Sequence, residues 1–182
     1  MDVRRVVTGH DENGKAVIVG DEMVAPVTLA LSPGNGFHRL WGSDSTASFP
    51  DDGSRPEGEM YFPPVGGFRF GFFTIPPDAG AGAPADLDFD AAIAEFEAKL
   101  PGLAEHLEPE QPGMHTTATV DYGIVVSGEA IMELDDGAKV ALRAGDSYIM
   151  NGTRHRWSNT GSVPAVIAVT LIGANHGTVT GA

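Results

Sequence analysis

The segment that most constrains the fold is residues 113–128, which read GMHTTATVDYGIVVSG. Apolar and polar residues alternate along it, as they do in a strand with one buried face. Four polar side chains fall at every second position and would share one face of that strand, namely His115, Thr117, Thr119 and Asp121. A polar face of this kind points either to solvent or into a cavity.

A second segment favours the cavity. Residues 145–159 read GDSYIMNGTRHRWSN and add a further histidine, His155, together with Asn159. It is costly to bury three ionisable side chains such as His115, Asp121 and His155 without a purpose. We therefore expect the polar face to line a cavity and to carry a functional site.

The two segments together resemble the signature motifs of the cupin superfamily. In that family the first motif contains a His-x-His pair, then a glutamate and a glycine, and the second contains a histidine with an asparagine four positions later. Here His115 matches the first histidine, Asp121 matches the glutamate, and Gly128 follows at the family's spacing. His155 and Asn159 match the second motif.

This sequence departs from the family pattern at three points. Thr117 occupies the position of the second histidine, and the carboxylate is the aspartate Asp121 instead of a glutamate. Asn151 stands near the usual proline, in a spacer that is one residue short. A neutral hydroxyl is a poor metal ligand, so the expected site has one imidazole fewer than the family pattern.

The resemblance covers roughly residues 66–172, and it implies a single all-β cupin barrel, a jelly roll or double-stranded β-helix. It also implies a divalent metal ion (Fe, Mn, Ni, Zn or Cu) held by His115, Asp121 and His155, which would be the catalytic residues. Two imidazoles with one carboxylate form the facial arrangement typical of Fe(II). Such a metal would polarise a carbonyl or enolate, or activate oxygen.

The function that we favour is a metal-dependent small-molecule enzyme acting on an oxo, enol, aromatic or polyketide-like substrate. Dioxygenase, decarboxylase and isomerase activities all agree with the resemblance. Cupins with this variant first motif resemble accessory enzymes of secondary metabolism. Two alternatives stay open: a non-catalytic cupin that binds a small molecule, and a metal-free His–Asp–His cluster that acts as acid and base.

Aliphatic and aromatic side chains are expected to line the cavity beside the polar face. Arg69 lies among phenylalanines and could clamp a substrate carboxylate or enolate, with an internal salt bridge as the alternative role. The expected substrate pocket consists of Arg69, Phe73, Met114, Thr117, Thr119, Met132, Tyr148 and Trp157.

The chain divides into a long first part, the barrel and a short tail. Residues 1–65 predict an N-terminal strand extension followed by a loop, with a hairpin turn at Asn13-Gly14. Residues 66–173 predict the barrel, and residues 174–182 a small polar tail. Further along, the pattern predicts a continuous strand over Ile124–Leu134 and a second hairpin turn of the Asp-Gly type after it.

A helical insertion interrupts the barrel at residues 84–110, next to the first motif. Within it the pattern predicts a helix from Asp86 to Leu107, broken at Pro101-Gly102, with Asp86 or Asp88 as the N-cap. The side chains expected on its inner side are Leu87, Ala91, Ala94, Ala98 and Leu100.

Composition limits the partners. A net charge of −14 argues against nucleic acid and anionic membranes, because both select for Lys and Arg clusters. The absence of cysteine removes disulfides and thiolate ligands. The N-terminus lacks a signal-peptide core and no apolar run approaches about 18 residues, so we expect a cytoplasmic protein. Unpaired edges of the N-terminal strands predict a homodimer.

Overall fold

The computed structural model describes residues 2–55, 58, 60–79 and 82–177, and its main feature is a pair of facing sheets. The larger sheet has five antiparallel strands in the order β3-β4-β10-β5-β8. Their bounds are Gly36–Ser43 for β3, Phe68–Ile75 for β4, Ala165–Gly173 for β10, Thr119–Ser127 for β5 and Ser147–Asn151 for β8.

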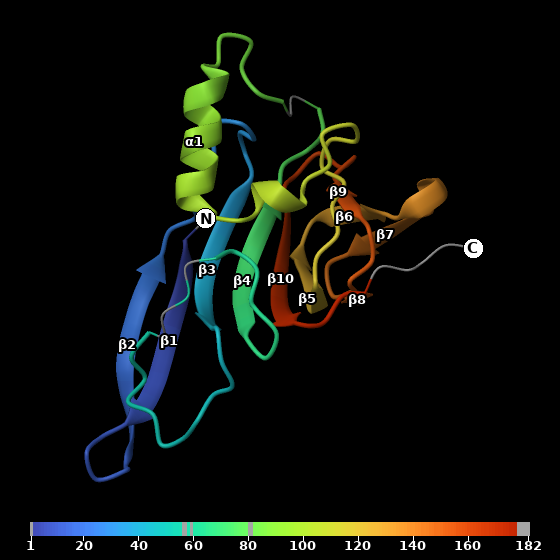
Figure 1. Ribbon diagram of the computed structural model, residues 1–182. Helices are drawn as coiled ribbons and strands as arrows, with labels where there is room; N and C mark the ends of the chain where they lie inside the picture. The colour runs from blue at the N-terminus through green and yellow to red at the C-terminus, as the bar shows by residue number, and fades with distance from the viewer. Residues whose placement is uncertain (1, 56–57, 59, 80–81, 178–182) are drawn as a thin grey trace.

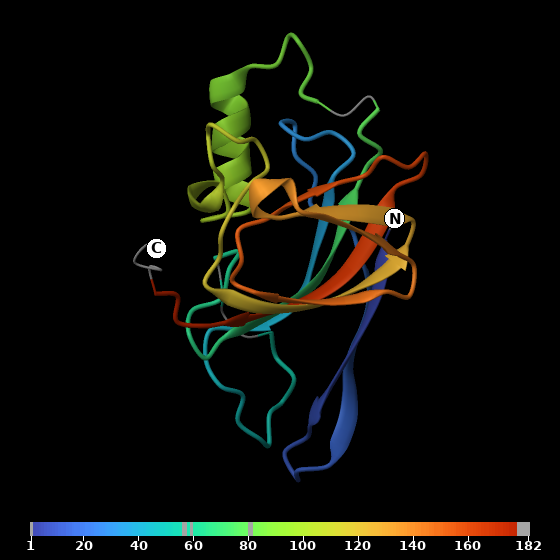
Figure 2. The same ribbon diagram turned by 90° about the vertical axis from the view of Figure 1, so that its right-hand side faces the viewer.

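The smaller sheet is antiparallel too, in the order β7-β6-β9. Its strands span Glu129–Glu133 for β6, Lys139–Arg143 for β7 and Arg156–Ser158 for β9. The two sheets enclose the barrel interior (Figure 2). Side chains from both sheets, including Val125, Ile167 and Leu142, form one buried cluster between them. The fold is therefore all-β, the double-stranded β-helix barrel that the resemblance implies.

The chain crosses from the larger sheet to the smaller sheet at Gly128, between β5 and β6. The sequence predicts a continuous strand over Ile124–Leu134, whereas the structure ends β5 at Ser127 and begins β6 at Glu129. Gly128 between them has a φ of 74°, and a Cβ there would lie 2.6 Å from the carbonyl oxygen of Pro164. Only glycine meets both requirements without strain. The apolar pattern cannot show this break, because apolar residues continue from β5 into β6 on both sides of the glycine.

The predicted Asp-Gly turn between β6 and β7 is confirmed. Residues Asp135–Gly137 form the short 3₁₀ turn η2, in which Asp136 has a φ of 56° and Gly137 a φ of 74°. Aspartate and glycine are among the residues that tolerate left-handed backbone best.

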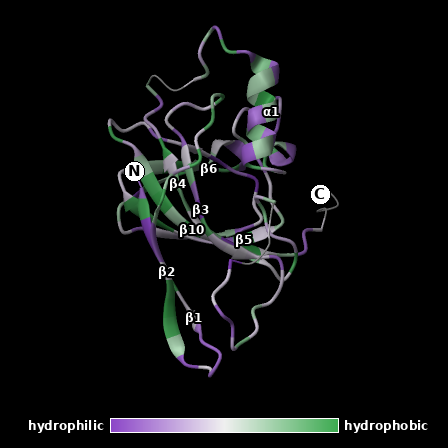
Figure 3. Cartoon of the chain, turned by 90° about the vertical axis from the view of Figure 1, so that its left-hand side faces the viewer, coloured by the Kyte–Doolittle hydropathy of each residue, from purple (hydrophilic) through white to green (hydrophobic). Residues whose placement is uncertain are grey.

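The N-terminal strands form a hairpin that projects from the barrel (Figure 1). Strands β1 (Val3–His10) and β2 (Ala16–Val24) pair with each other in a separate two-stranded sheet. The predicted turn is confirmed, with Gly14 at a φ of 75°. Hydrophobic stretches lie along this hairpin (Figure 3). After the hairpin, Val27 forms a single antiparallel bridge with Phe37 of β3.

The insertion contains the helix α1 (Phe89–Lys99) and the 3₁₀ turn η1 (Ala104–His106), and α1 stands beside one end of the barrel (Figures 1 and 2). Of the two expected N-caps, Asp88 caps the helix by accepting a hydrogen bond from the Ala91 N–H at 3.1 Å. Ala92 and Phe96 are the buried residues of α1. Leu100 is buried as expected, whereas Ala91, Ala94 and Ala98 are exposed, so the buried face of α1 is rotated by about one position from the expected face.

Contacts with the loop after β2 explain this rotation. Phe96 packs with Leu29 and Leu103 in a second buried cluster, which the amphipathic pattern of the helix alone could not locate. Two polar contacts fix the helix there, since Lys99 donates to the Thr28 carbonyl at 2.8 Å and the Glu95 carboxylate accepts from the Ala30 N–H at 2.9 Å. Within the described ranges, neither α1 nor the short turns have the length and hydrophobicity needed to cross a bilayer.

Candidate functional site

A cavity of about 300 Å³ lies inside the barrel. Both sheets, the loop after β2, the segment around residue 61 and the helical insertion contribute to its wall. Aromatic and aliphatic side chains dominate. Its lining residues are Leu29, Ser32, Asn35, Phe37, Tyr61, Phe62, Phe73, Ile75, Phe96, Leu103, Leu107, Gly113, His115, Asp121, Tyr148, His155, Trp157, Val169 and Leu171.

His115 and His155 form an imidazole pair in this wall. Each residue donates its backbone N–H to the carbonyl of the other at 2.9 Å, so the two motifs are joined by an isolated antiparallel bridge. The ring centroids consequently lie 4.2 Å apart. His115 and His155, which are 40 positions apart in the chain, therefore lie side by side in the wall of one cavity.

The hydrogen bonds of the two rings define their protonation. Nδ1 of His115 lies 3.0 Å from the Gly113 carbonyl and Nδ1 of His155 lies 2.8 Å from the Thr153 carbonyl, so in a neutral ring Nδ1–H is the donor. Burial lowers the pKa of His115, and burial together with the charge of His115 lowers the pKa of His155 to about 4. Two neutral imidazoles therefore keep the Nε2 lone pair for other partners.

Asp121 enters the same cavity from near the start of β5. Burial alternates along β5, so that Thr119, Asp121 and Gly123 face inward while Tyr122 is 49% exposed on the outer face. Asp121 itself is 7% exposed, and its Oδ1 is a buried atom without a hydrogen-bond partner in the described part of the chain. Burial raises the pKa of Asp121 to about 6, although a hydrogen bond with Thr119 lowers it in part.

Two tyrosines lie in the electrostatic field of this carboxylate. Burial raises the pKa of Tyr148 and the charge of Asp121 raises it further. Tyr61 has a raised pKa for the same two reasons, partly offset by the charge of Arg39. Both phenols are therefore protonated at neutral pH and can donate hydrogen bonds inside the cavity.

Gly123 makes room for the ring of Tyr148. These two residues are paired in the register of β5 and β8, two residues along from the pair of Asp121 with Met150. A Cβ at position 123 would lie 2.2 Å from Cζ of Tyr148 and 2.5 Å from its hydroxyl oxygen. The phenol thus lies directly across the backbone of β5, near Asp121, and any larger residue at position 123 would displace it.

The expected three-ligand metal site is met only in part. Two adjacent imidazoles with free Nε2 atoms are suitable metal donors. However, no group of three or more His, Cys, Asp or Glu side chains among the described residues is arranged to hold a metal ion. The carboxylate at this position is that of Asp121, which is one methylene shorter than the glutamate of the resemblance. These residues do not fit the expected three-ligand site as they stand.

Of the eight expected pocket residues, Phe73, Tyr148 and Trp157 line the cavity. Their rings contact one another, with centroids 5.8 Å apart for Phe73 and Trp157 and 5.0 Å apart for Tyr148 and Trp157. Four others lie behind the wall. Thr117 and Thr119 are buried and joined by a hydrogen bond of 2.8 Å between their hydroxyls, Met114 is 2% exposed, and Met132 packs against the core.

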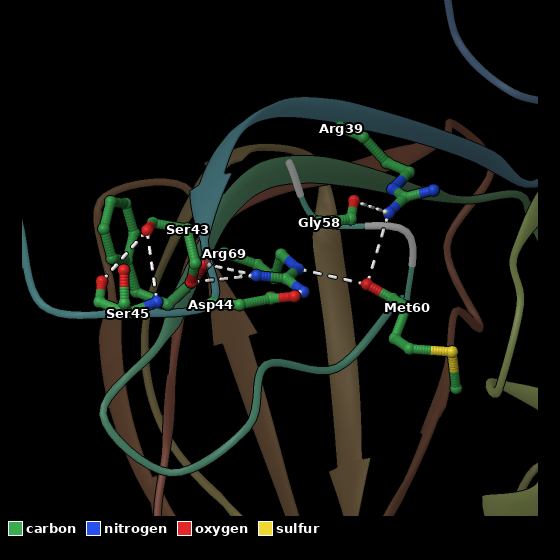
Figure 4. Close-up of polar contacts among 8 residues, drawn as sticks. Arg39, Ser43, Asp44, Ser45, Gly58, Met60 and Arg69 are labelled. Atoms are coloured by element: carbon green, nitrogen blue, oxygen red, sulfur yellow. Dashed lines mark hydrogen bonds and ion pairs between the residues drawn. The ribbon is translucent and has the colours of Figure 1, made fainter. Parts of the chain in front are cut away.

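Arg69 is not among the residues that line this cavity. Its guanidinium donates to the carbonyl oxygens of Met60, Ser43 and Phe68 at 3.0–3.1 Å and pairs with Asp44 at 2.5 Å (Figure 4). The alternative role as an internal salt bridge is the one observed. The alternation of β4 directs this side chain to the face of the sheet that carries the loop after β3.

The sequence analysis did not identify the cavity residues supplied by loops. Tyr61 and Phe62 come from a Pro- and Gly-rich segment, and Phe96 and Leu103 come from the insertion. An aromatic pair inside an otherwise polar loop is a signal that could have found Tyr61 and Phe62, because such a pair needs a place to be buried. Nothing local marks Phe96, whose direction depends on the packing of α1.

Comparisons with known proteins agree with the barrel. Residues 104–171 match the family described as "Cupin domain". The chain is 41% identical over 89 residues to Oryzines biosynthesis cluster protein J of Aspergillus oryzae, which covers 42% of this chain and 50% of that protein. It is 30% identical over 95 residues to the Cupin-domain-containing oxidoreductase fogC of Aspergillus ruber, and this match covers 50% of this chain and 43% of that protein. The matched stretch thus spans half or less of the length of these relatives.

Among solved structures, a predicted oxalate decarboxylase from Thermotoga maritima is 14% identical, covers 82% of this chain and 93% of its own, and superposes with a TM-score of 0.44. The family match lies on the segment that contains His115, Asp121 and His155, together with the strands that position them. Sequence match and barrel agree, and this chain carries a small domain of the cupin superfamily.

Proposed function

We propose that this cupin is a small-molecule enzyme that transfers a proton within an oxo or enol substrate of aromatic or polyketide-like skeleton. Asp121 is the base, and the substrate occupies the barrel cavity. The observation that carries the proposal is the buried Asp121 carboxylate, whose Oδ1 has no partner among the described residues while it lines a largely apolar cavity. Names of relatives from biosynthesis clusters support a substrate of secondary metabolism.

The pKa of Asp121 suits this role. A general base acts best when its pKa lies near the working pH, and burial raises the pKa of this carboxyl to about 6. At neutral pH it is mostly ionised and still a useful acceptor. The imidazoles are weaker bases, since the pKa of His155 is lowered to about 4. We assign to His115 and His155 the orientation of the substrate, because each Nε2 can accept a hydrogen bond from a hydroxyl group.

The proton transfer follows from these assignments. Asp121 removes a proton from the carbon next to the substrate carbonyl, and the electron pair of that C–H bond forms the new C=C bond. The carbonyl π pair moves to oxygen, and the phenol of Tyr148 or Tyr61 donates a hydrogen bond to the resulting enolate. Asp121 then returns its proton to carbon at the same or a conjugated position. Atoms and electrons balance without an oxidant.

Hydrogen exchange in an aromatic methyl ketone tests the proposal without the natural substrate. The probe is 2-acetylnaphthalene in D₂O, and the measurement is loss of its methyl proton signal by NMR. We expect the protein to accelerate exchange and Asp121→Asn to reduce that acceleration about 100-fold or more, which is the usual contribution of a general base. Asp136→Asn is the matched control, because Asp136 is exposed and has a left-handed φ that asparagine tolerates.

Equal exchange rates for the wild type and Asp121→Asn would contradict the proposal. Exchange that never exceeds the rate in buffer would instead favour the non-catalytic alternative, a cupin that binds a small molecule. Circular dichroism and urea denaturation of each variant separate a lost base from a lost fold.

A second candidate is a metal-dependent oxidoreductase. The two free Nε2 atoms favour it, as does the printed name of fogC. Elemental analysis of the purified protein tests it directly, and a stoichiometric transition metal would place this candidate first. Asp121→Glu provides a second test. The longer side chain would bring its carboxylate closer to the imidazoles, so Zn²⁺ affinity measured by chelator competition should rise, whereas the matched Asp136→Glu should leave it unchanged.

A further inference from the structure

The charges around the barrel cavity determine which ligands it can hold. We propose that the cavity is a charge filter, which accepts uncharged aromatic ligands and excludes carboxylates. This inference deepens the proposed function, because the group that repels anions is the proposed base. It names the substrate class as a neutral aromatic oxo or enol compound, and it follows from the positions of the charged side chains around the cavity.

Among the described residues that line the cavity, Asp121 is the acidic one. The side chain is 7% exposed, so bulk water screens it little, and its Oδ1 has no partner in the described ranges. Its charge acts on the phenols of Tyr61 and Tyr148, which lie on the cavity wall. A ligand that contacts those rings therefore lies in the field of an ionised carboxylate.

No described lining residue is lysine or arginine. The nearest arginines by sequence, Arg154 and Arg156, point away from the cavity and bind carboxylates elsewhere. Arg154 donates to Glu108 at 2.6 Å and to Asp135 at 2.7 Å, and Arg156 donates to Glu133 at 2.9–3.0 Å. Arg69 is held on the outer side of its sheet by Asp44 and by backbone carbonyls. These contacts hold Arg69, Arg154 and Arg156 away from a bound ligand. Arg39, whose charge acts on Tyr61, donates to the carbonyls of Gly58 and Met60 and is not among the residues that line the cavity.

The imidazole pair does not offset the negative charge either. Hydrogen bonds from Nδ1–H to backbone carbonyls leave Nε2 as an acceptor in both rings. The rings lie 4.2 Å apart, a separation at which two positive charges would repel each other strongly. The cavity therefore presents acceptors and one anion, and its lining side chains with donor groups are all neutral: the two phenols, Ser32, Asn35 and Trp157.

The aromatic walls of the cavity also favour a neutral aromatic ligand. Phe73, Tyr148 and Trp157 contact one another by tilted and edge-on ring packing, and Phe37 and Tyr61 add a further edge-on pair at 6.0 Å. A flat aromatic ligand extends this packing and fills the apolar volume. A carboxylate attached to the same ring would lose its hydration and gain no cation in return.

The expected discrimination can be worked out from the charges. Two like charges about 6 Å apart, in a medium with an effective dielectric constant of about 20, repel each other enough to weaken binding about 100-fold. Loss of hydration adds to this repulsion. The neutral member of an isosteric pair should therefore bind at least about 100-fold more tightly than the anionic member.

Calorimetric titration at pH 8 with 2-acetylnaphthalene and 2-naphthoate tests the filter, since these compounds differ by a methyl ketone in place of a carboxylate. We expect the wild type to bind the ketone about 100-fold more tightly, and Asp121→Asn to reduce the ratio to less than about tenfold by gaining affinity for the naphthoate. The control Asp136→Asn should keep the wild-type ratio. The cation 2-naphthylmethylamine is included to test whether the preferred charge is positive.

Three results would overturn the inference: naphthoate binding as tightly as the ketone, a ratio that Asp121→Asn leaves unchanged, or no measurable binding of the ketone. Tighter binding of the amine than of the ketone would also overturn the assignment to neutral ligands. Failure here is distinct from failure of the proposed function. Exchange that depends on Asp121 can coexist with a non-selective cavity, and a selective cavity can exist without any exchange.

Discussion

Gly123→Ala is the substitution that most directly tests how the site is built. The added Cβ would lie 2.2 Å from Cζ of Tyr148, whereas non-bonded carbon atoms approach to about 3.5–4.0 Å. The ring must therefore retreat by about 1.3–1.8 Å, or β5 and β8 must move apart by a similar amount. Either movement disturbs the contact of Tyr148 with Trp157, whose centroids lie 5.0 Å apart.

Two opposing terms set the effect on stability. Overpacking of a core costs about 1–3 kcal/mol, and alanine is favoured over glycine in a strand by about 0.5–1 kcal/mol. We expect Gly123→Ala to lower the free energy of unfolding by about 1–2 kcal/mol. Displacement of the phenol by more than about 1 Å should also reduce exchange of the ketone probe by about 100-fold.

Gly20→Ala in β2 is the matched control. A Cβ at position 20 would lie 3.6 Å from Cβ of Val7, an ordinary contact, and the residue has no positive φ. Urea denaturation at 25 °C should find this control as stable as the wild type or slightly more stable, with unchanged exchange activity. The reasoning is refuted if Gly123→Ala matches Gly20→Ala in both measurements.

Three further predictions concern folding, pH and assembly. Asn159→Ala should lower the free energy of unfolding by about 3 kcal/mol in urea denaturation. The reason is that the fully buried amide donates to the Ile75 and Val163 carbonyls and accepts from the Gly161 N–H. A loss below about 1 kcal/mol would show that the amide is dispensable. The pKa of Asp121 is raised to about 6, above the value of about 3.9 for an unfolded aspartate, so the folded state binds the additional proton between these pH values. The free energy of unfolding should therefore fall as the pH rises from about 4 to about 6, and a wild-type slope that persists in Asp121→Asn would assign it to another group. We also predict a homodimer through the N-terminal hairpin, where Ile18 is 73% exposed. Light scattering should find a dimer, and Ile18→Lys should weaken it. A monomer at all concentrations would exclude the predicted dimer.

The sequence alone determined the barrel and the identity of its polar groups. Alternating burial along β5, the Asp-Gly turn and the hairpin at Asn13-Gly14 are local properties of the chain, fixed by the two-residue repeat of a strand and by the left-handed φ that few residues accept. The same repeat placed Asp121 inward and Tyr122 outward.

Only the tertiary structure decided how these groups are combined. The pairing of His115 with His155 depends on a bridge between distant segments, and the absence of a three-ligand group among the described residues depends on how those segments pack against β5. Arg69 is directed outward because the loop after β3 supplies its carbonyl and carboxylate partners on that face. Sequence patterns report which face a residue occupies, whereas distances across a cavity depend on how two sheets and an insertion pack, and no local repeat encodes that packing.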